Sequence, residues 1–306
     1  MQVSVIVCTR DRAYAITACL NSIAASLQNV APAFAEILVV DNGSTDATSQ
    51  TVKTWAESCA FPVRLLHEEK KGLSHARNCG MAAAQGALII FTDDDCRLDL
   101  NHIADALRHD AADEEPVLRG GRVELGNSED LPLSIKTQAT PMRWTRQMRS
   151  ARHENVADAI VGCNMALRKT LAQKIGWFDP RFGAGSSIPG GEDTDYIYRA
   201  YLADVTLEYV PDMVVYHHHG RKTPDEGNKL MRNYAIGTGA LFVKYVTKDM
   251  DFCRPLLWDA KHALTELRTR KNVCMPHLNY TYKDKFKHHA LGMARYIGAL
   301  LRNPSR

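Results

Sequence analysis

The sequence has no hydrophobic run long enough to cross a bilayer, which needs about 18 apolar residues in a row. None of its eight cysteines stands in a C-x-x-C pair, so neither a zinc site nor a disulfide framework is predicted. The formal net charge is only +3, too small by itself to indicate a nucleic-acid-binding protein. The first residues lack a charged leader followed by an apolar core, so we expect no signal peptide. Reduced thiols and a cytoplasmic location are therefore the expectation.

What the sequence does contain, in its first part, is a regular alternation of strand-like and helix-like segments. The predicted strands are Val3–Val7, Glu36–Val40, Val63–Leu66 and Ala87–Phe91, and the predicted helices are Tyr14–Leu27, Ser44–Trp55 and Ser74–Ala84. Such alternation predicts right-handed βαβ units and an α/β fold with a mostly parallel sheet. Ligands of these sheets bind outside the carboxyl ends of the strands, and polar residues follow all four predicted strands.

The regularity ends after residue 99. We expect a helix over 99–112, an interrupted strand over 117–125, and a long loop or flap over 126–155. A second core segment then follows, with strand-like residues 159–167, a helix to 175, a glycine-rich loop over 183–191 and a helix over 194–202. A pair of strands is predicted at 206–209 and 213–216, and the chain beyond residue 220 is mainly helical and basic.

Two acidic clusters carry the strongest chemical signal. The first is Asp93-Asp94-Asp95 at the end of a buried strand, where carboxylates beside a phosphate suit Mg²⁺ or Mn²⁺. Taken alone, this triplet is also typical of a solvated turn. The second is Glu192-Asp193-Thr194-Asp195, where acids at a helix start are favoured by the helix dipole. Three acids are more than are needed to stabilise the start of a helix, so one of them is a candidate general base.

Three further motifs have both a structural and a functional interpretation. Asp41 ends a strand and can accept from a ribose or base, although the following Gly43-Ser44 is ordinary turn chemistry. Arg77 lies about one turn into a helix, where it can clamp a phosphate or form a surface ion pair. Three histidines, His217 to His219, follow a strand, and His217 or His219 can complete the coordination of a metal.

Taken in order along the chain, these motifs resemble the glycosyltransferase family 2 enzymes, which have the GT-A fold. The matching segments are residues 3–11, 36–46, 72–80, 91–95, 161–166, 176–179, 191–195 and 214–217, and they cover roughly residues 1–220. The resemblance implies a GT-A domain built from a nucleotide-sugar-binding part (1–100) and an acceptor-binding, catalytic part (101–220), followed by a helical C-terminal extension (221–306).

The resemblance also implies roles for individual residues. The nucleotide-sugar donor would be held by Thr9, Arg10, Asp11, Asp41, Arg77, Asp93 and Asp94. Mn²⁺ or Mg²⁺ would be bound by Asp95 with Asp93, His217 and His219. Asp193 would be the catalytic base with Glu192 beside it, and Trp177, Asn164 and Asp195 would contact the acceptor.

The activity so implied is inverting, metal-dependent transfer of a sugar, with UDP as the expected nucleotide, to a saccharide or lipid-linked saccharide in polysaccharide biosynthesis. A nucleotidyltransferase is the rival enzyme, but the first strand is not followed by the glycine-rich basic loop that it would need. A non-catalytic carbohydrate-binding protein is the other alternative, although binding alone requires neither a metal nor a base. No nucleic-acid partner is expected.

The segment 283–302 combines apolar residues with lysines and arginines. This pattern is typical of a helix on an anionic membrane surface, which would place the protein peripherally at the inner face of the membrane. It is equally typical of an amphipathic helix packed on its own core, and that interpretation is slightly favoured.

Overall fold

The computed structural model describes residues 2–30, 35–148 and 156–302. They form two compact units: unit 1 comprises residues 1–178 and 193–220, and unit 2 comprises residues 179–192 and 221–306. The predicted division into 1–100, 101–220 and 221–306 stays a prediction. All eight cysteines are free.

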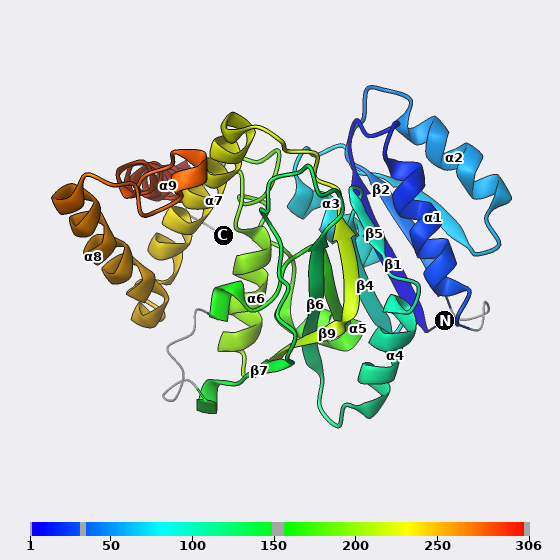
Figure 1. Ribbon diagram of the computed structural model, residues 1–306. Coiled ribbons are helices and arrows are strands. Elements are labelled where there is room, and N and C mark those ends of the chain that lie inside the picture. Colours follow the sequence, from blue (N-terminus) through cyan, green and yellow to red (C-terminus); the bar gives the residue numbers. More distant parts are fainter. Residues whose placement is uncertain (1, 31–34, 149–155, 303–306) are drawn as a thin grey trace. The chain divides into compact units, whose positions relative to one another are not determined.

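Unit 1 is built on a nine-stranded sheet of the described residues (Figure 1). The strands are β1 (Val3–Thr9), β2 (Ala35–Asp41), β3 (Val63–His67), β4 (Leu88–Asp93), β5 (Cys96–Leu98), β6 (Val117–Leu125), β7 (Met142–Trp144), β8 (Asn164–Arg168) and β9 (Thr206–His217). Their order is β3-β2-β1-β4-β8-β6-β9-β5, with β7 paired to β9. The helices are α1 (Ile16–Leu27), α2 (Thr48–Ser58), α3 (Leu73–Ala83), α4 (His102–Ala112), α5 (Lys169–Ile175) and α6 (Glu192–Leu202).

The first four strands are the parallel βαβ array that the alternation predicts. Strands β1, β2 and β4 are buried along almost their whole length, as expected for strands that are covered on both faces. Helix α1 contacts both α2 and α4 on one face of the sheet, and α3 packs on β1 and β2 from the other face (Figure 1). The α/β fold class is therefore confirmed.

Beyond β4 the sheet is mixed rather than mostly parallel. Strand β8 pairs antiparallel with β4 and β6, and β5 and β7 pair antiparallel with β9. The predicted pair of strands at 206–209 and 213–216 is one continuous strand, because β9 runs on past the shift in its register with β6 at Gly121/Arg122. The predicted loop contains β7, and residues 149–155 lie outside the described residues.

The two predicted helices that start at serines, Ser44–Trp55 and Ser74–Ala84, begin at other residues in the structure. The hydroxyl of Ser44 accepts a hydrogen bond from the backbone N–H of Asp11, and α2 begins later, at Thr48. Helix α3 begins after Gly72, which has a φ of 135°, a value that glycine adopts readily. Ser74 is buried in the first turn of this helix. Ser44 therefore serves a tertiary contact instead of the nearest free backbone N–H.

Unit 2 contains α7 (Pro224–Tyr245), α8 (Arg254–Thr269) and α9 (Tyr282–Arg302), so the helical C-terminal extension is confirmed. Helices α7 and α9 pack closely because each presents glycine to the other. A Cβ on Gly239 would lie 2.1 Å from the carbonyl oxygen of His289, and one on Gly292 would lie 2.0 Å from that of Ile236. Across the described ranges, no helix is both long enough and apolar enough to span a membrane.

Candidate active site

The sheet register brings the predicted polar residues to one edge of unit 1. Thr9 is the register partner of Asp41, and Cys8 is the partner of Asp93, so β1, β2 and β4 end side by side. On the other half of the sheet, Cys96 pairs with His217. The carboxyl ends of the parallel strands β1, β2 and β4 therefore form the edge at which α/β sheets bind ligands.

The loop after β1 contacts the first acidic cluster directly. The Thr9 hydroxyl donates to the Asp94 carboxylate at 2.7 Å. The Arg12 guanidinium lies 3.5 Å from Asp94 and 3.6 Å from Asp95. Burial raises the pKa of Asp94 to about 7, against the opposing charge of Arg12. The triplet is therefore not a solvated turn, and Arg12 is a site residue that the sequence reasoning missed.

The residues predicted to hold the nucleoside lie in two loops that are held together by hydrogen bonds. Backbone N–H of Thr45 donates to the Asp11 carboxylate at 2.7 Å, and backbone N–H of Ser44 donates to Asp41 at 2.8 Å. The Ser49 hydroxyl donates to the other oxygen of Asp41. Asp41 is buried, and its hydrogen bonds within the turn account for its presence there more fully than expected. Asp11 is exposed, and its carboxylate lies 3.5 Å from the Arg10 guanidinium.

Asn42 is a second residue that the sequence reasoning missed. Its side-chain amide donates to the carbonyl oxygens of Glu68 and Lys70 and accepts from the N–H of Gly72 at 2.8 Å. One buried side chain therefore ties the end of β2 to the loop that starts α3. The signal in the sequence was a polar residue directly after a buried strand, which reads equally well as part of the turn.

Arg77 is buried, not a surface ion pair. Its guanidinium lies over the ring of Phe178 at 5.4 Å and 3.3 Å from the Asp93 carboxylate. Burial raises the pKa of Asp93, and the positive charge of Arg77 opposes that shift. A buried cation held by a ring and a carboxylate is pre-organised to face an anionic ligand.

Asp95 and His217 are the candidate metal-binding pair of this site. Nε2 of His217 lies 3.3 Å from Oδ1 of Asp95. Burial lowers the pKa of His217, but the hydrogen bond to Asp95 outweighs it and brings the pKa to about 9. A carboxylate oxygen and an imidazole nitrogen that converge in this way suit a divalent cation. In the described ranges, the one such group of His, Cys and acid side chains consists of Asp95, Cys96 and His217.

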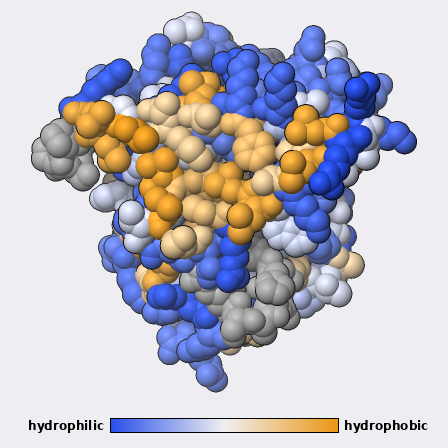
Figure 2. Space-filling view, turned by 90° about the vertical axis from the view of Figure 1, so that its left-hand side faces the viewer, coloured by the Kyte–Doolittle hydropathy of each residue, from blue (hydrophilic) through white to orange (hydrophobic). Residues whose placement is uncertain are grey.

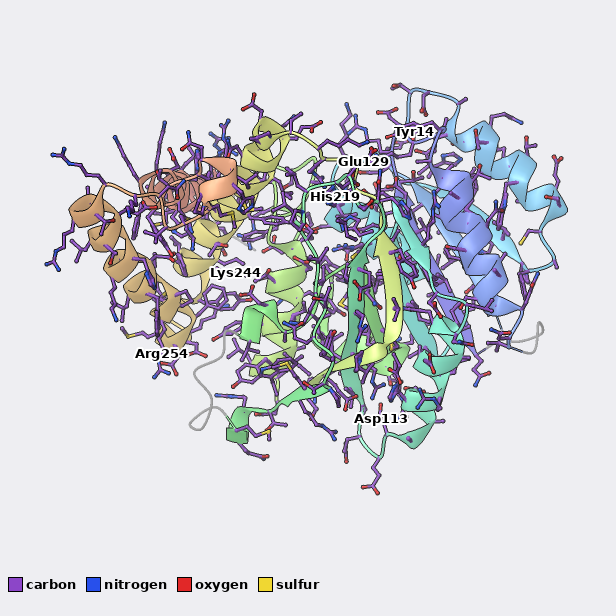
Figure 3. All side chains as sticks on the ribbon, in the orientation of Figure 1. Tyr14, Asp113, Glu129, His219, Lys244 and Arg254 are labelled. Atoms are coloured by element: carbon purple, nitrogen blue, oxygen red, sulfur yellow. The ribbon has the colours of Figure 1, made fainter. Side chains whose placement is uncertain are left out.

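Three other side chains lie near that pair: Cys96, which the sequence did not predict as a ligand, and the predicted ligands His219 and Asp93. A hydrogen bond to Cys163 and burial raise the pKa of the Cys96 thiol well above its usual range. His219 (labelled in Figure 3) packs edge-on against His217 with ring centroids 5.2 Å apart, and it lies 3.0 Å from the carbonyl oxygen of Leu131 and 3.8 Å from the Asp130 carboxylate. Asp93 is held by Arg77. We therefore retain Asp95 and His217 as the candidate ligands.

Asp193 lies in the same neighbourhood. Its carboxylate accepts from backbone N–H of Gly162 at 3.1 Å and of Thr194 at 2.7 Å. A Cβ built on Gly162 would be 2.8 Å from this carboxylate and 3.2 Å from the Arg77 guanidinium, so both side chains converge on one glycine. The charge of Asp193 also acts on Asp93 and raises its pKa. The two acidic clusters therefore share one site in unit 1.

The remaining acids of the second cluster are placed differently. Glu192 is the first residue of α6, and it is buried against Gly183 in unit 2. Asp195 is fully buried and accepts from Arg199 at 3.0 Å, and Arg199 in turn donates to the carbonyl oxygens of Ile175 and Trp177. Asp195 is thus a structural ion-pair partner that is not available to an acceptor.

Asn164 and Trp177, both predicted to contact the acceptor, lie outside the acidic cluster. The Asn164 amide is fully buried: it donates to the carbonyl oxygens of Arg122 and Met213 and contacts His102 at 2.8 Å, which leaves nothing for an acceptor. Trp177 is 59% exposed.

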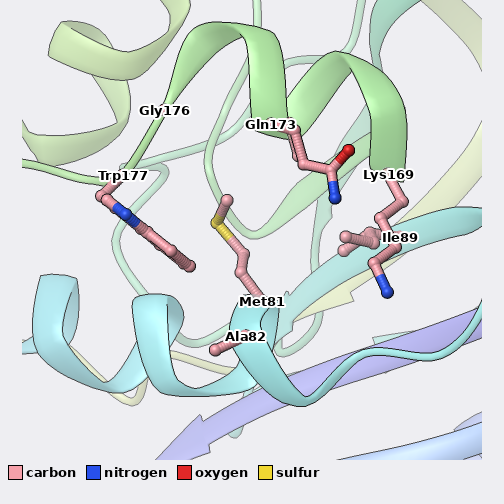
Figure 4. A pocket seen from close by; sticks show the side chains of 8 residues that line it. Met81, Ala82, Ile89, Lys169, Gln173, Gly176 and Trp177 are labelled. Carbon is pink, nitrogen blue, oxygen red and sulfur yellow. The ribbon is translucent and has the colours of Figure 1, made fainter.

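Trp177 lines a separate pocket of about 330 Å³ (Figure 4). Met81, Ile89 and Lys169 are among the other side chains around it. Ile89 is near the start of β4, whereas Asp93 is at the end of that strand. The pocket therefore belongs to the opposite end of β4 from the acidic cluster.

Comparison with known proteins identifies the family. Residues 4–176 match the family model of glycosyl transferase family 2, which is more than half of the chain. The chain belongs to this family. Among curated glycosyltransferases, it is 25% identical over 244 residues to the glycosyltransferase AglE of Haloferax volcanii, covering 79% of this chain and 73% of that protein. It is 24% identical to bovine polypeptide N-acetylgalactosaminyltransferase 6, covering 62% of this glycosyltransferase and only 33% of that protein.

Solved structures show that this family 2 glycosyltransferase has the GT-A fold. Staphylococcus aureus TarS 1–349 superposes with a TM-score of 0.59 at 18% identity, over 100% of this chain and 92% of that one. The mannosyltransferase PcManGT from Pyrobaculum calidifontis, in complex with GDP-Man and Mn²⁺, superposes with a TM-score of 0.60 at 20% identity, over 99% and 79%.

Proposed function

We propose that this glycosyltransferase moves a sugar from a nucleoside diphosphate donor to a hydroxyl of a saccharide acceptor, with inversion and with Asp193 as the general base. The observation that carries the proposal is the convergence of Asp193 and Arg77 on Gly162, beside Asp93. A proton acceptor and a buried cation then face one space, which is what a single in-line displacement with an anionic leaving group requires.

The donor would lie along the carboxyl ends of β1, β2 and β4. Thr9, Arg10, Asp11 and Asp41 line this edge and are proposed to hold the nucleoside, and Asn42 is proposed to position the loop before α3. TarS has been solved with UDP and with UDP-GlcNAc, and PcManGT with GDP-Man, which supports a nucleoside diphosphate sugar as donor. We take UDP as the first candidate.

The chemistry that follows from the side chains concerns one proton. The two backbone N–H groups on Asp193 hold its carboxylate in a fixed orientation, and that carboxylate takes the proton of the acceptor hydroxyl as the oxygen attacks the anomeric carbon. Arg77, 3.3 Å from Asp93, provides positive charge for the departing diphosphate. Asp95 and His217 would hold Mn²⁺ or Mg²⁺, which when bound stabilises negative charge on the leaving group.

Fewer residues are proposed to contact the acceptor than the donor. Contact of Glu192 and Trp177 with the acceptor stays a prediction. For Asn164 and Asp195 we propose a role in the scaffold instead, because both are fully buried and hydrogen-bonded. The acceptor is proposed to be a saccharide, free or lipid-linked, in the synthesis of a polysaccharide.

The decisive experiment compares Asp193→Asn with Asp204→Asn. Asp204 follows α6 and its side chain is 74% exposed, so it is a matched change of charge outside the site. We expect Asp193→Asn to lower turnover by a factor of about 10²–10⁴ with the affinity for the nucleotide unchanged, and Asp204→Asn to do neither. Undiminished turnover in Asp193→Asn would remove the assignment of the base.

Three readouts test the rest of the proposal. Release of a nucleoside diphosphate from the donor indicates sugar transfer, whereas release of pyrophosphate would indicate nucleotidyl transfer. The anomeric configuration of the product, read by NMR, tests inversion. Full activity in excess EDTA would count against Asp95 and His217 as metal ligands.

A further inference from the structure

Helix α8 in unit 2 turns its apolar side chains to the solvent. Leu257, Leu264 and Leu267 recur on one stripe of the helix and are 73%, 54% and 76% exposed. Trp258 beside them is 61% exposed. In an ordinary amphipathic helix of a soluble protein this stripe faces the core.

The acids of α8 occupy the inner face instead. Glu266 accepts from the backbone N–H groups of Val273, Cys274 and Tyr282. Asp259, buried, accepts from Lys285 of α9 at 2.7 Å. These two carboxylates hold α8 to the following turn and to α9, so α8 itself contributes no acid to its outer face. Asp251, just before the helix, pairs with Arg254 at 3.0 Å.

Basic residues run beside the apolar stripe. Arg254, Lys261 and Arg268 recur at seven-residue spacing and stand three or four positions from Leu257 and Leu264, which makes them surface neighbours. All three are exposed. The α8–α9 region, residues 254–302, contains ten Lys or Arg against three Asp or Glu, a net charge of +7 that exceeds the +3 of the whole chain.

Helix α9 adds a second exposed stripe. Its members are Lys283, Lys287, Ala290, Ala294, Ile297 and Leu301, spaced by four and three residues, and all are exposed. The stripe is basic at its start and apolar at its end. Figure 2 shows apolar side chains gathered on the side of the molecule that carries α8 and α9, with strongly hydrophilic side chains around them.

We propose that this face, here called the α8–α9 face, docks on the surface of an anionic lipid bilayer. Leucine and tryptophan enter the interface between headgroups and acyl chains, and the adjacent lysines and arginines bind the lipid phosphates. The charge complementarity selects a lipid surface over a second copy of this chain, because two copies would bring two strongly basic faces together. The inference does not depend on the transfer reaction.

The test is flotation of the full chain with lipid vesicles. One set contains phosphatidylcholine and phosphatidylglycerol in equal parts, and the other contains phosphatidylcholine alone. We expect binding to the anionic set, weakened by high salt, and little binding to the neutral set. Each basic residue at an anionic surface is worth about fivefold in partitioning, so Lys261→Gln with Arg268→Gln should lower binding about 25-fold.

Matched variants locate the surface. Leu257→Ser, Leu264→Ser and Leu267→Ser together should lower binding on the order of a thousandfold. Leu100→Ser, a change at a leucine of unit 1 that is 54% exposed, should leave binding unchanged. Lys53→Gln with Lys174→Gln, two exposed bases of unit 1, is the control for charge.

Three results would overturn the proposal. The wild-type chain fails to float with anionic vesicles, or the triple serine variant floats like the wild type. In the third, neither protein binds vesicles, and light scattering after gel filtration shows that the wild type is a dimer whereas the triple serine variant is a monomer. The face would then be an interface between copies of the chain. Because melting temperature and donor turnover are measured on each variant, loss of folding or of the transferase function is seen separately.

Discussion

A single methyl group on Gly162 should disable the proposed base. A Cβ at this position would stand 2.8 Å from both Cβ and Oδ2 of Asp193. Non-bonded carbon contacts are relaxed at about 3.5–4.0 Å, so the Asp193 side chain must move by roughly 1 Å. That movement also stretches the 3.1 Å bond from the Gly162 N–H to Asp193. Misplacement by about 1 Å in a reacting group costs about 10²-fold, or roughly 3 kcal/mol of barrier.

The assay is the release of the nucleoside diphosphate from the donor, with water or a saccharide as acceptor. We expect Gly162→Ala to lower kcat about 10²-fold while the affinity for the nucleotide, measured by calorimetry, changes little. The control is Gly298→Ala in α9, where an added Cβ meets nothing within 4 Å. Its kcat should equal that of the wild type, with a gain in stability of about 0.5–1 kcal/mol from the better helix former.

A double-mutant cycle shows whether the methyl group acts through Asp193. If it does, Gly162→Ala should have no further effect on a chain that already carries Asp193→Asn. Full kcat in Gly162→Ala, or a second 10²-fold loss added to that of Asp193→Asn, would refute the reasoning. Either result would mean that Asp193 and Gly162 do not act as one unit.

Two further predictions concern the stability of unit 2. Burial lowers the pKa of His289 to about 4 from 6.5, and its ring lies between Phe242 and Phe286 with no hydrogen-bond partner on either nitrogen in the described part of the chain. Since the folded state disfavours the protonated form, stability is fully present above pH 6.5 and is lost, by about 3 kcal/mol, as pH falls to about 4. His289→Leu should flatten this dependence in urea unfolding at a series of pH values, and an unchanged pH profile would contradict it. Thr223 closes a capping box with Glu226 at the start of α7, so Thr223→Ala should lower the free energy of unfolding by about 1 kcal/mol, whereas Thr265→Ala on the exposed face of α8 should have little effect.

The sequence alone determined the α/β fold and the positions of its chemistry. Strands β1, β2 and β4 are apolar runs covered on both faces, so their hydrophobic pattern is visible without any tertiary information, and the polar residues that follow them are visible for the same reason. The family could be inferred because those motifs occur in a fixed order along residues 1–220. Helix starts were less accurate: Ser44 accepts from the backbone N–H of the distant Asp11, and α2 begins later, at Thr48.

The tertiary structure alone decided which of the polar residues meet. Arg12, Asn42 and Gly162 are ordinary loop residues in the sequence, and they join the site only because β1, β2 and β8 bring their loops to one edge. Asn164, Asp195 and His219 carry the right functional groups, but partners far along the chain, or one helical turn away in the case of Asp195, occupy them. The hydrophobic pattern of a strand or helix depends only on the spacing of its own apolar residues, so it can be read from the sequence. The pairing of charged side chains depends on which strands become neighbours, and the whole sheet determines that.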